Sequence, residues 1–223
     1  MEKNMNQSGR SMVEILGVLA IIGVLSVGGI AGYSKAMYKY KVNKFTDQMN
    51  NIIANIRASF GAQKSVEGLN NENIKKMGLV PEDMYKDKDS DYPEHSWGGQ
   101  IYFGAPYYNT FDDDGNYTGT FSPDNIFYIS MNRLPKDVCM TMLTADWGMD
   151  LIGMGAQFLG GSPVPNGFDY NKASSVFAKP GDKDYPAPYS MTRAEKVCAE
   201  ADEYASKQGI SVSGMTFYWY FGL

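Results

Sequence analysis

The segment Gly9-Arg10-Ser11-Met12-Val13-Glu14 is followed by an uncharged apolar run from Ile15 to Ser34. The run is about 20 residues long, which is the length that an α-helix needs to span the hydrocarbon core of a bilayer. Glu14 stands at the start of this run, where a carboxylate is costly to insert into hydrocarbon. We therefore expect Glu14 to have a function of its own.

A second helical pattern continues from the apolar run without an intervening proline. From Val42 to Phe60, apolar residues recur at steps of three and four, which is typical of an amphipathic helix, and Gly61 predicts its end. The sequence therefore predicts one helix of about 50 residues, near 75 Å long at 1.5 Å per residue. We expect its first half to be buried on all sides and its second half to pack one stripe against the rest of the chain.

The rest of the chain is a mixture of short predicted helices and strands. Strands are predicted at Ile126–Met131 and Met215–Phe221, and the aromatic composition of the second indicates a central, doubly covered strand. Helices are predicted over Asn71–Gly78, with Asn71 as the cap, and over Pro135–Leu143. A last helix begins with the capping box Thr192-Arg193-Ala194-Glu195. These elements predict an α+β fold.

Two stretches without clear periodicity, Asp83–Phe121 and Gly148–Asp184, are expected to be irregular. The first contains His95, the single histidine, which we expect in a surface loop. A Ser-His-Asp site needs only one histidine, but no nucleophile-elbow pattern accompanies this one. The sequence also contains no P-loop, Rossmann fingerprint or zinc-binding spacing. It therefore predicts neither an enzyme nor a cofactor.

The chain is acidic, with a net charge of −5 and a pI near 4.9, so nucleic-acid binding is not predicted. Two acidic clusters, Asp112-Asp113-Asp114-Gly115-Asn116 and Asp87-x-Asp89-x-Asp91, place carboxylates as calcium loops do. Neither cluster completes an EF-hand. The second, for example, has Tyr92 where Gly is required and no Glu at the twelfth position. We expect both clusters to be solvated turns and predict no metal site.

The N-terminal pattern resembles that of the type IV pilin family. Precursors in this family carry a short polar leader that ends in Gly, a membrane peptidase cleaves after this Gly, and the new amino terminus is N-methylated. In this sequence Gly9 matches the leader Gly, Arg10 becomes the first mature residue, and Glu14 matches the Glu that is fifth in the mature chain. Arg10 departs from the apolar first residue that is usual in the family, although its long side chain can snorkel to the headgroups.

Three features of the later chain also resemble the type IVb pilin head. They are Leu134-Pro135-Lys136-Asp137-Val138-Cys139 after a strand, the segment Asn73 to Pro81, and Cys198 in a late helix before the aromatic strand. The resemblance implies an α+β fold in which a long N-terminal helix packs on an antiparallel β-sheet head. The parts would be 1–9 as leader, 10–34 as the transmembrane and filament-core half of the helix, 35–62 as its amphipathic half and 63–223 as the globular head.

The resemblance implies a structural subunit of a type IV pilus, with a role in adhesion, motility or aggregation. The precursor would lie in the inner membrane with its head on the periplasmic side, and the mature subunit would join an extracellular helical filament. Its partners would be other copies of itself, the prepilin peptidase and the pilus assembly machinery. The amino group of Arg10 would pair with Glu14 of a neighbour or of its own chain and set the axial register. The alternatives are a pseudopilin of a type II secretion system and a membrane-anchored domain without a filament role.

Cys139 and Cys198 are the only cysteines and stand outside any Cys-x-x-Cys motif. In an exported chain, two cysteines most simply form one disulfide. Such a bridge closes a loop of about 60 residues and contributes roughly 3–5 kcal/mol in the chain-entropy model. Two buried free thiols are the alternative.

Two other interpretations of the N-terminus remain open. A secretory signal peptide has a shorter apolar core, of roughly 7–15 residues, and a clean small-x-small cleavage site. A simple membrane anchor accounts for the length of the run but not for the pattern from Gly9 to Glu14. By the positive-inside rule, four lysines after the run favour a cytoplasmic C-terminal part: Lys35, Lys39, Lys41 and Lys44. Long domains translocate largely regardless of flanking charge, so we expect an exported head.

Overall fold

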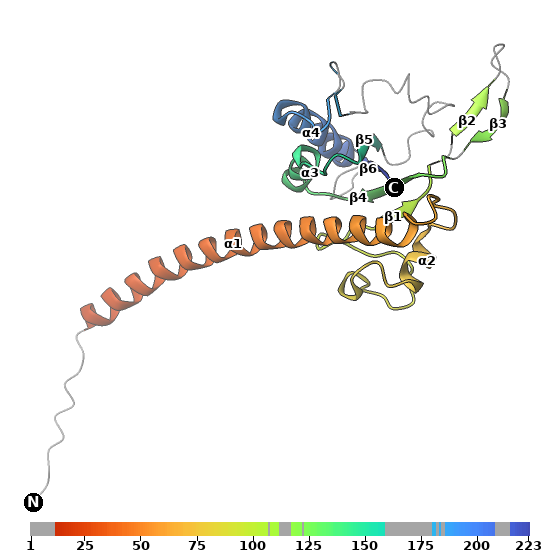
Figure 1. Ribbon diagram of the computed structural model, residues 1–223. Coiled ribbons are helices and arrows are strands. Elements are labelled where there is room, and N and C mark those ends of the chain that lie inside the picture. The colour runs from red at the N-terminus through yellow and green to blue at the C-terminus, as the bar shows by residue number, and fades with distance from the viewer. Residues whose placement is uncertain are drawn as a thin grey trace, which may run out of the picture. The chain divides into compact units, whose positions relative to one another are not determined.

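The computed structural model describes residues 12–106, 108–111, 117–121, 123–158, 180–181, 183, 186–207 and 215–223. The chain divides between Lys44 and Phe45 into two compact units. Figure 1 labels the α-helices and β-strands. In chain order the elements are α1 (Met12–Phe60), α2 (Asn71–Lys76), the 3₁₀ helix η1 (Glu82–Met84), β1 (Ile101–Gly104), β2 (Tyr108–Phe111), β3 (Tyr117–Phe121), β4 (Ile126–Asn132), α3 (Lys136–Thr144), β5 (Leu151–Phe158), α4 (Met191–Lys207) and β6 (Met215–Gly222).

The long helix predicted from the sequence is present as α1, which has 49 residues and ends one residue before Gly61. Side chains from Met12 to Tyr33 are exposed, whereas burial begins at Phe45. The buried positions recur at steps of three and four, as the sequence predicted, because such residues share one face of a helix. They are Phe45, Met49, Ile52, Ile53, Ile56 and Phe60.

A four-stranded antiparallel sheet in the order β1-β4-β6-β5 forms the centre of the second unit, so the α+β prediction is confirmed. The terminal strand β6 lies between β4 and β5, as its aromatic composition indicated. Strands alternate their side chains between two faces, so the register of β4 and β6 puts buried pairs on one face. These pairs are Phe127 with Phe221, Ile129 with Trp219 and Met131 with Phe217.

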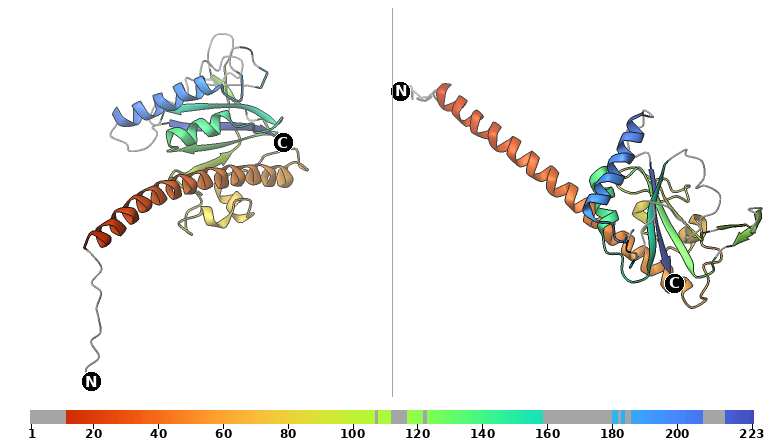
Figure 2. Two further views of the ribbon diagram at one scale, coloured as in Figure 1. Left: turned by 90° about the vertical axis from the view of Figure 1, so that its left-hand side faces the viewer. Right: turned by 90° about the horizontal axis from the view of Figure 1, so that it is seen from above.

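The helices α3 and α4 lie side by side on one side of this sheet (Figure 2). Trp147, just after α3, is buried and its ring lies 6.2 Å from that of Trp219 in β6. The Trp147 indole N–H donates to the Met142 carbonyl oxygen at 2.9 Å, which satisfies its polar group inside the core. This contact joins the end of α3 to the sheet.

The prediction of two irregular stretches was wrong in part. Strand β5 lies within Gly148–Asp184, and strands β1, β2 and β3 lie within Asp83–Phe121. The β5 sequence alternates Gly153 and Gly155 with larger residues, and glycine removes the side-chain pattern that marks a strand in sequence. The segment is a strand because its backbone pairs with β6. This pairing joins residues that are distant in sequence, so local sequence patterns do not predict it.

The N-cap residues of two helices differ from the predicted ones. Asn70 rather than Asn71 caps α2, with its side chain accepting from the Asn73 N–H at 2.9 Å. Asn71 is buried instead, and its amide donates to the Ile101 carbonyl and accepts from the Phe103 N–H of β1. In α4, Ser190 rather than the predicted capping box accepts from the Arg193 N–H, at 3.3 Å.

Candidate functional site: an exposed apolar helix and a disulfide-closed head

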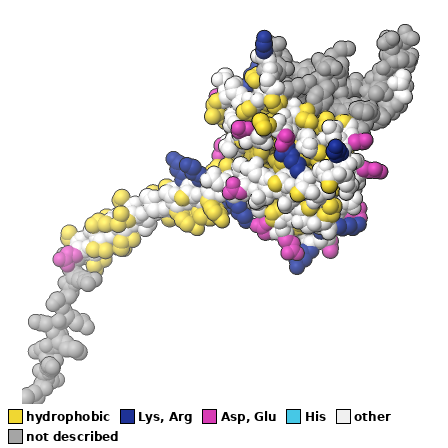
Figure 3. All heavy atoms as spheres, viewed as in Figure 1, with side chains coloured by type: hydrophobic (Ala, Val, Ile, Leu, Met, Phe, Trp, Pro, Cys, Tyr) yellow, Lys and Arg dark blue, Asp and Glu magenta, His cyan; other side chains and the backbone are white. Residues whose placement is uncertain are grey.

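The first unit presents a continuous apolar surface on α1. Its side chains from Met12 to Ile30 are exposed, with Val24 at 75% and Leu25 at 68%. Figure 3 shows this surface in yellow along the helix. By length and composition α1 can cross a membrane, since its most apolar 18-residue window has a mean hydropathy of 2.4. An apolar surface of this extent is stable only when a bilayer or other apolar surfaces remove it from water.

Glu14 lies in the first turn of α1 and is exposed. A carboxylate in the first turn interacts favourably with the helix dipole, which provides partial positive charge at that end. In hydrocarbon the carboxylate still needs a cationic partner, because its desolvation is costly. Gly9 and Arg10, the predicted processing residues, lie outside the described residues.

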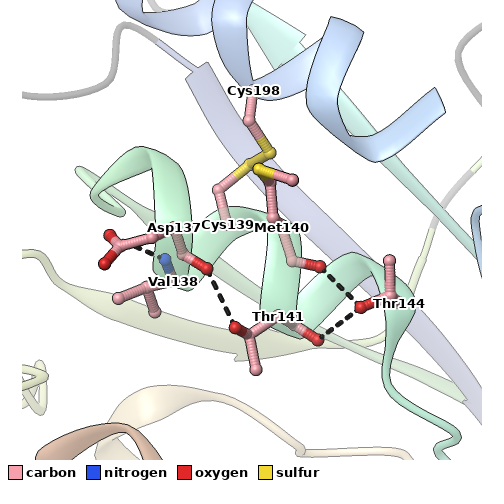
Figure 4. The surroundings of a disulfide bond; sticks show 7 residues. All are labelled: Asp137, Val138, Cys139, Met140, Thr141, Thr144 and Cys198. Carbon is pink, nitrogen blue, oxygen red and sulfur yellow. Dashed lines mark hydrogen bonds between the residues drawn. A yellow bond between two sulfur atoms is a disulfide. The ribbon is translucent and has the colours of Figure 1, made fainter. Parts of the chain in front are cut away.

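A disulfide joins Cys139 of α3 to Cys198 of α4, with their Cα atoms 6.0 Å apart (Figure 4). Both cysteines are buried, so the bridge lies between the two helices rather than on the surface. The prediction of a bridge is therefore confirmed, and the alternative of two free thiols is wrong. The bridge connects the helix that precedes β5 to the helix that precedes β6.

Small buried side chains of α4 lie beside this bridge, where α4 packs against α3. Ala194 and Ala201 of α4 are fully buried, and they lie on the same helix face as Cys198. On α3, the Asp137 carboxylate accepts from the Val138 N–H at 3.0 Å, and the Thr141 hydroxyl donates to the Asp137 carbonyl at 2.9 Å. The Asp137 carboxylate thus satisfies one N–H in the first turn of a helix that has no side-chain N-cap.

Arg57 connects the end of α1 to the C-terminal strand within the second unit. Its Nε donates to the Gly222 carbonyl oxygen at 3.1 Å, and its Nη1 lies 3.0 Å from the Asp150 carboxylate. The guanidinium also lies 5.7 Å from the centre of the Phe221 ring, within the range of a cation–π contact. The Gly222 N–H in turn donates to the Asp150 carbonyl. One side chain thus links α1, β6 and the residue that precedes β5.

His95 is buried, with 1% of its surface exposed, so the prediction of a surface-loop histidine was wrong. Its Nδ1 accepts from the Trp97 N–H at 3.2 Å, so the ring proton lies on Nε2 and is donated to the Asn132 carbonyl at 2.8 Å. The ring packs edge-on against Phe45 of α1. Burial lowers the pKa of His95, and the Asn132 carbonyl partly opposes this effect.

The close packing around His95 accounts for a glycine beside it. A Cβ atom at Gly99 would overlap both the Asn132 carbonyl oxygen and the His95 imidazole. The signal that sequence reasoning missed was the local pattern Trp97-Gly98-Gly99, in which an aromatic residue and two glycines follow the histidine. Glycine has no side chain, so two glycines next to a large aromatic ring indicate that chain segments approach each other closely there.

The loop that carries Asp87, Asp89 and Asp91 surrounds an ammonium group of the chain itself. The Lys75 Nζ donates to the carbonyl oxygens of Lys88 and Ser90 at 2.7 Å each, and its distance to the Asp91 carboxylate is 3.5 Å. Asp87 is used differently, since its carboxylate accepts from the Asp89 N–H at 2.9 Å. The loop with acidic residues at alternate positions therefore binds a cation, which is the Lys75 ammonium group of the same chain.

The structure describes no comparable arrangement for the other acidic cluster, since Asp112–Asn116 lies outside the described residues. Among the residues that are described, no group of three or more His, Cys, Asp or Glu side chains is placed to hold a metal ion. The cysteines lie in the second unit and Glu14 in the first. The described candidates are therefore an apolar helix with one carboxylate, and a head closed by one disulfide.

Comparisons with known proteins point to one family. The sequence model of the bundlin family matches residues 35–210. The major structural subunit of the bundle-forming pilus from Escherichia coli O127:H6 (strain E2348/69 / EPEC) is 23% identical over 154 residues, which are 69% of this chain and 72% of that protein. The subunit of the same name from Escherichia coli O111:H- is 24% identical over 149 residues, 67% of this chain and 70% of that protein. The family match begins after the apolar run, at residue 35.

Proposed function

The chain belongs to the bundlin family, and from that membership we propose that it is a structural subunit of a type IV pilus of the type IVb class. The observation that carries the proposal is the family match over residues 35–210, which spans most of the head. Its relatives are named as major structural subunits of a bundle-forming pilus. The function is structural, and the chain is not an enzyme.

The exposed apolar surface of α1 supports this function. A surface of this kind is buried in the bilayer before assembly and against the helices of other copies in the filament. When each copy binds the next through two different surfaces, and the rotation between neighbours does not close into a ring, the copies form a helical filament. The disulfide-closed head then forms the outer part of the polymer, where a covalent bridge protects it outside the cell.

Processing and location follow the pattern of the family. The prepilin peptidase cleaves between Gly9 and Arg10, and the assembly machinery transfers the mature subunit from the inner membrane to the filament. The head lies on the periplasmic side before assembly and outside the cell afterwards. The spacing of Gly9, Arg10 and Glu14 supports this route.

Glu14 sets the axial register in this proposal. The amino group of Arg10 in a neighbouring copy pairs with the Glu14 carboxylate, which offsets the cost of placing that carboxylate in an apolar core. A subunit that lacks the carboxylate inserts more easily into the membrane but loses the partner of the amine. No observation favours the alternative, a type II secretion pseudopilin.

Deletion of the gene tests the function. We expect cells without the chain to lack the filaments seen by electron microscopy, and expression of the chain from a plasmid to restore them. An antibody against the head should label the restored filaments along their length. Filaments of unchanged number and appearance in the deletion strain would contradict the proposal.

The variant Glu14→Val tests the assembly role. We expect the membrane fraction to hold normal amounts of this variant, because insertion becomes easier, while the sheared filament fraction falls at least tenfold. Val13→Ala, which changes an apolar neighbour in the same turn, is the matched control and should assemble normally. Normal filament yield from Glu14→Val would refute a register role for this carboxylate.

A further inference from the structure

The charge of this chain is divided unevenly between its two units. Residues 10–44 contain five Lys and Arg against one acidic residue, a net charge of +4, whereas residues 45–223 contain 14 Lys and Arg against 23 Asp and Glu, a net charge of −9. Four of these five basic residues lie between positions 35 and 44, just beyond the half of the helix that the proposed function places in the filament core. We define the lysine collar as Lys35, Lys39 and Lys41 of α1.

The lysine collar lies on exposed helix surface just beyond the apolar run. All three side chains are exposed, and Figure 3 shows basic side chains in dark blue on this part of the helix. Lys35 and Lys39 are four residues apart and share one face, whereas Lys41 points about 160° away from Lys39 around the helix axis. The collar therefore presents positive charge to more than one side of the helix.

Over the described part of the first unit, residues 12–44, no acidic residue lies near the collar. Between residues 10 and 44 the one acidic residue is Glu14, which precedes Lys35 by 21 residues, or about 32 Å along the helix. The lysines also oppose the positive-inside rule for a head that is exported. The collar lysines disfavour export and have no acidic residue close to them in the first unit. We therefore expect their negatively charged partner to lie outside this helix.

Lipid headgroups account for only part of the collar. The hydrocarbon core is about 30 Å thick and the bilayer with headgroups about 40–45 Å, so each headgroup layer is roughly 5–7 Å deep. Lys35 follows directly on the apolar run that ends at Ser34. The Lys41 backbone lies seven residues, or about 10 Å, beyond Ser34, so its ammonium reaches that layer only if the side chain extends back toward the membrane. A protein partner with negative charge fits all three positions.

We propose that the lysine collar of one copy contacts carboxylates on the head of another copy in the filament. This inference rests on the proposed function. It specifies the part of the helix that the acidic head of a neighbouring copy contacts. The two surfaces have opposite net charge within one sequence, so every copy carries both halves of the contact. Complementary charge of this kind favours correct docking and disfavours the approach of collar to collar.

Zero-length cross-linking tests the contact directly. A carbodiimide activates a carboxylate, and a lysine amine in contact with it then forms an amide bond. Filaments are grown from cells that contain a mixture of ¹⁴N- and ¹⁵N-labelled subunits, cross-linked, digested and analysed by mass spectrometry. We expect mixed-label peptides that join the collar to Asp or Glu of the head, residues 63–223. Such peptides should be absent from subunits solubilised as monomers in detergent.

Charge variants give an independent readout. Lys39→Gln combined with Lys41→Gln should reduce filament yield about twofold to fivefold per lysine, the range expected for exposed ion pairs. Lys39→Glu combined with Lys41→Glu should reduce it further. Asn43→Gln, at an exposed position of α1 next to the collar, changes no charge and should have little effect.

The outcomes separate this proposal from the proposed function. If the wild-type chain forms no filament, the proposed function fails. If wild-type filaments form but yield cross-links from the collar only within one copy, or yield none, the collar contact is wrong. Reduced binding of the unassembled Gln variant to anionic vesicles, without mixed-label cross-links in filaments, would assign the lysines to lipid instead.

Discussion

At the scale of single residues, His95 shows how a titratable group is held neutral in the core. Nδ1 accepts a backbone hydrogen bond from Trp97 and Nε2 donates one to Asn132, so both ring nitrogens are satisfied only in the neutral form. Protonation of Nδ1 removes the acceptor that Trp97 needs. The nearest charged groups that affect the ring are Lys86, which lowers its pKa, and Glu94, which raises it.

Stability should therefore depend on pH through His95. Because the folded-state pKa of His95 is lowered, the unfolded state binds the proton more readily, and stability is lost as the pH falls below the unfolded value of about 6.5. The unfolding midpoint of the full chain in detergent, measured between pH 7.5 and 5, should fall with acid. His95→Phe, which lacks the titration, should show a flatter dependence although it is less stable overall. Equal slopes for the two proteins would contradict this account.

Sequence reasoning located the residues with distinctive spacing but not those whose role arises in the fold. Glu14 and the cysteines were identified from position and count, and the bridge between Cys139 and Cys198 is present. The burial of His95 and the role of Lys75 depend on segments that are distant in sequence, such as Asn132 and the loop from Lys88 to Asp91. Local sequence patterns therefore cannot predict these contacts.

At the scale of elements, the long helix was the most predictable feature because its periodic pattern extends over many turns. The apolar stripe from Phe45 to Phe60 matches the buried face of α1. Strand β5 was missed because Gly153 and Gly155 leave little alternation to detect, and its pairing with β6 is set by the sheet. The central position of β6 was predictable because its side chains are large and apolar on both faces.

Removal of the disulfide should weaken the connection between α3 and α4. In the double variant Cys139→Ser with Cys198→Ser, the free energy of unfolding should fall by about 3–5 kcal/mol, since the bridge spans 59 residues of sequence. Chemical unfolding of the purified chain measures the loss. Alkylation of the exported wild-type protein that labels two free thiols would show that the bridge does not form in the cell.

The loop from Tyr85 to Asp91 should depend on the Lys75 ammonium. Lys75→Met keeps most of the side-chain length but leaves the Lys88 and Ser90 carbonyls without their donor, so we expect a loss of roughly 1–3 kcal/mol. Trypsin cleavage after the lysines of this loop should become faster. Lys76→Met, at the neighbouring position on the helix surface, is the matched control. Unchanged cleavage of the Lys75 variant would show that the ammonium does not hold the loop.

At the scale of the whole molecule, the chain combines an apolar helix that needs other surfaces with a head that folds around its own core. The helix up to residue 44 supplies Glu14 and the lysine collar, while the head supplies the disulfide and most of the negative charge. Asp112–Asn116 stays a predicted solvated turn without tight calcium binding, because three adjacent aspartates supply fewer oxygens than the six to eight that calcium takes.

The central claim is that copies of this chain, cut before Arg10, make up an extracellular pilus. Intact-mass spectrometry of filaments sheared from the cell surface tests it most directly. We predict a dominant species whose mass corresponds to residues 10–223 with one methyl group at the amino terminus and one disulfide. A filament fraction without this chain, while the uncut precursor remains in the membrane, would contradict the account.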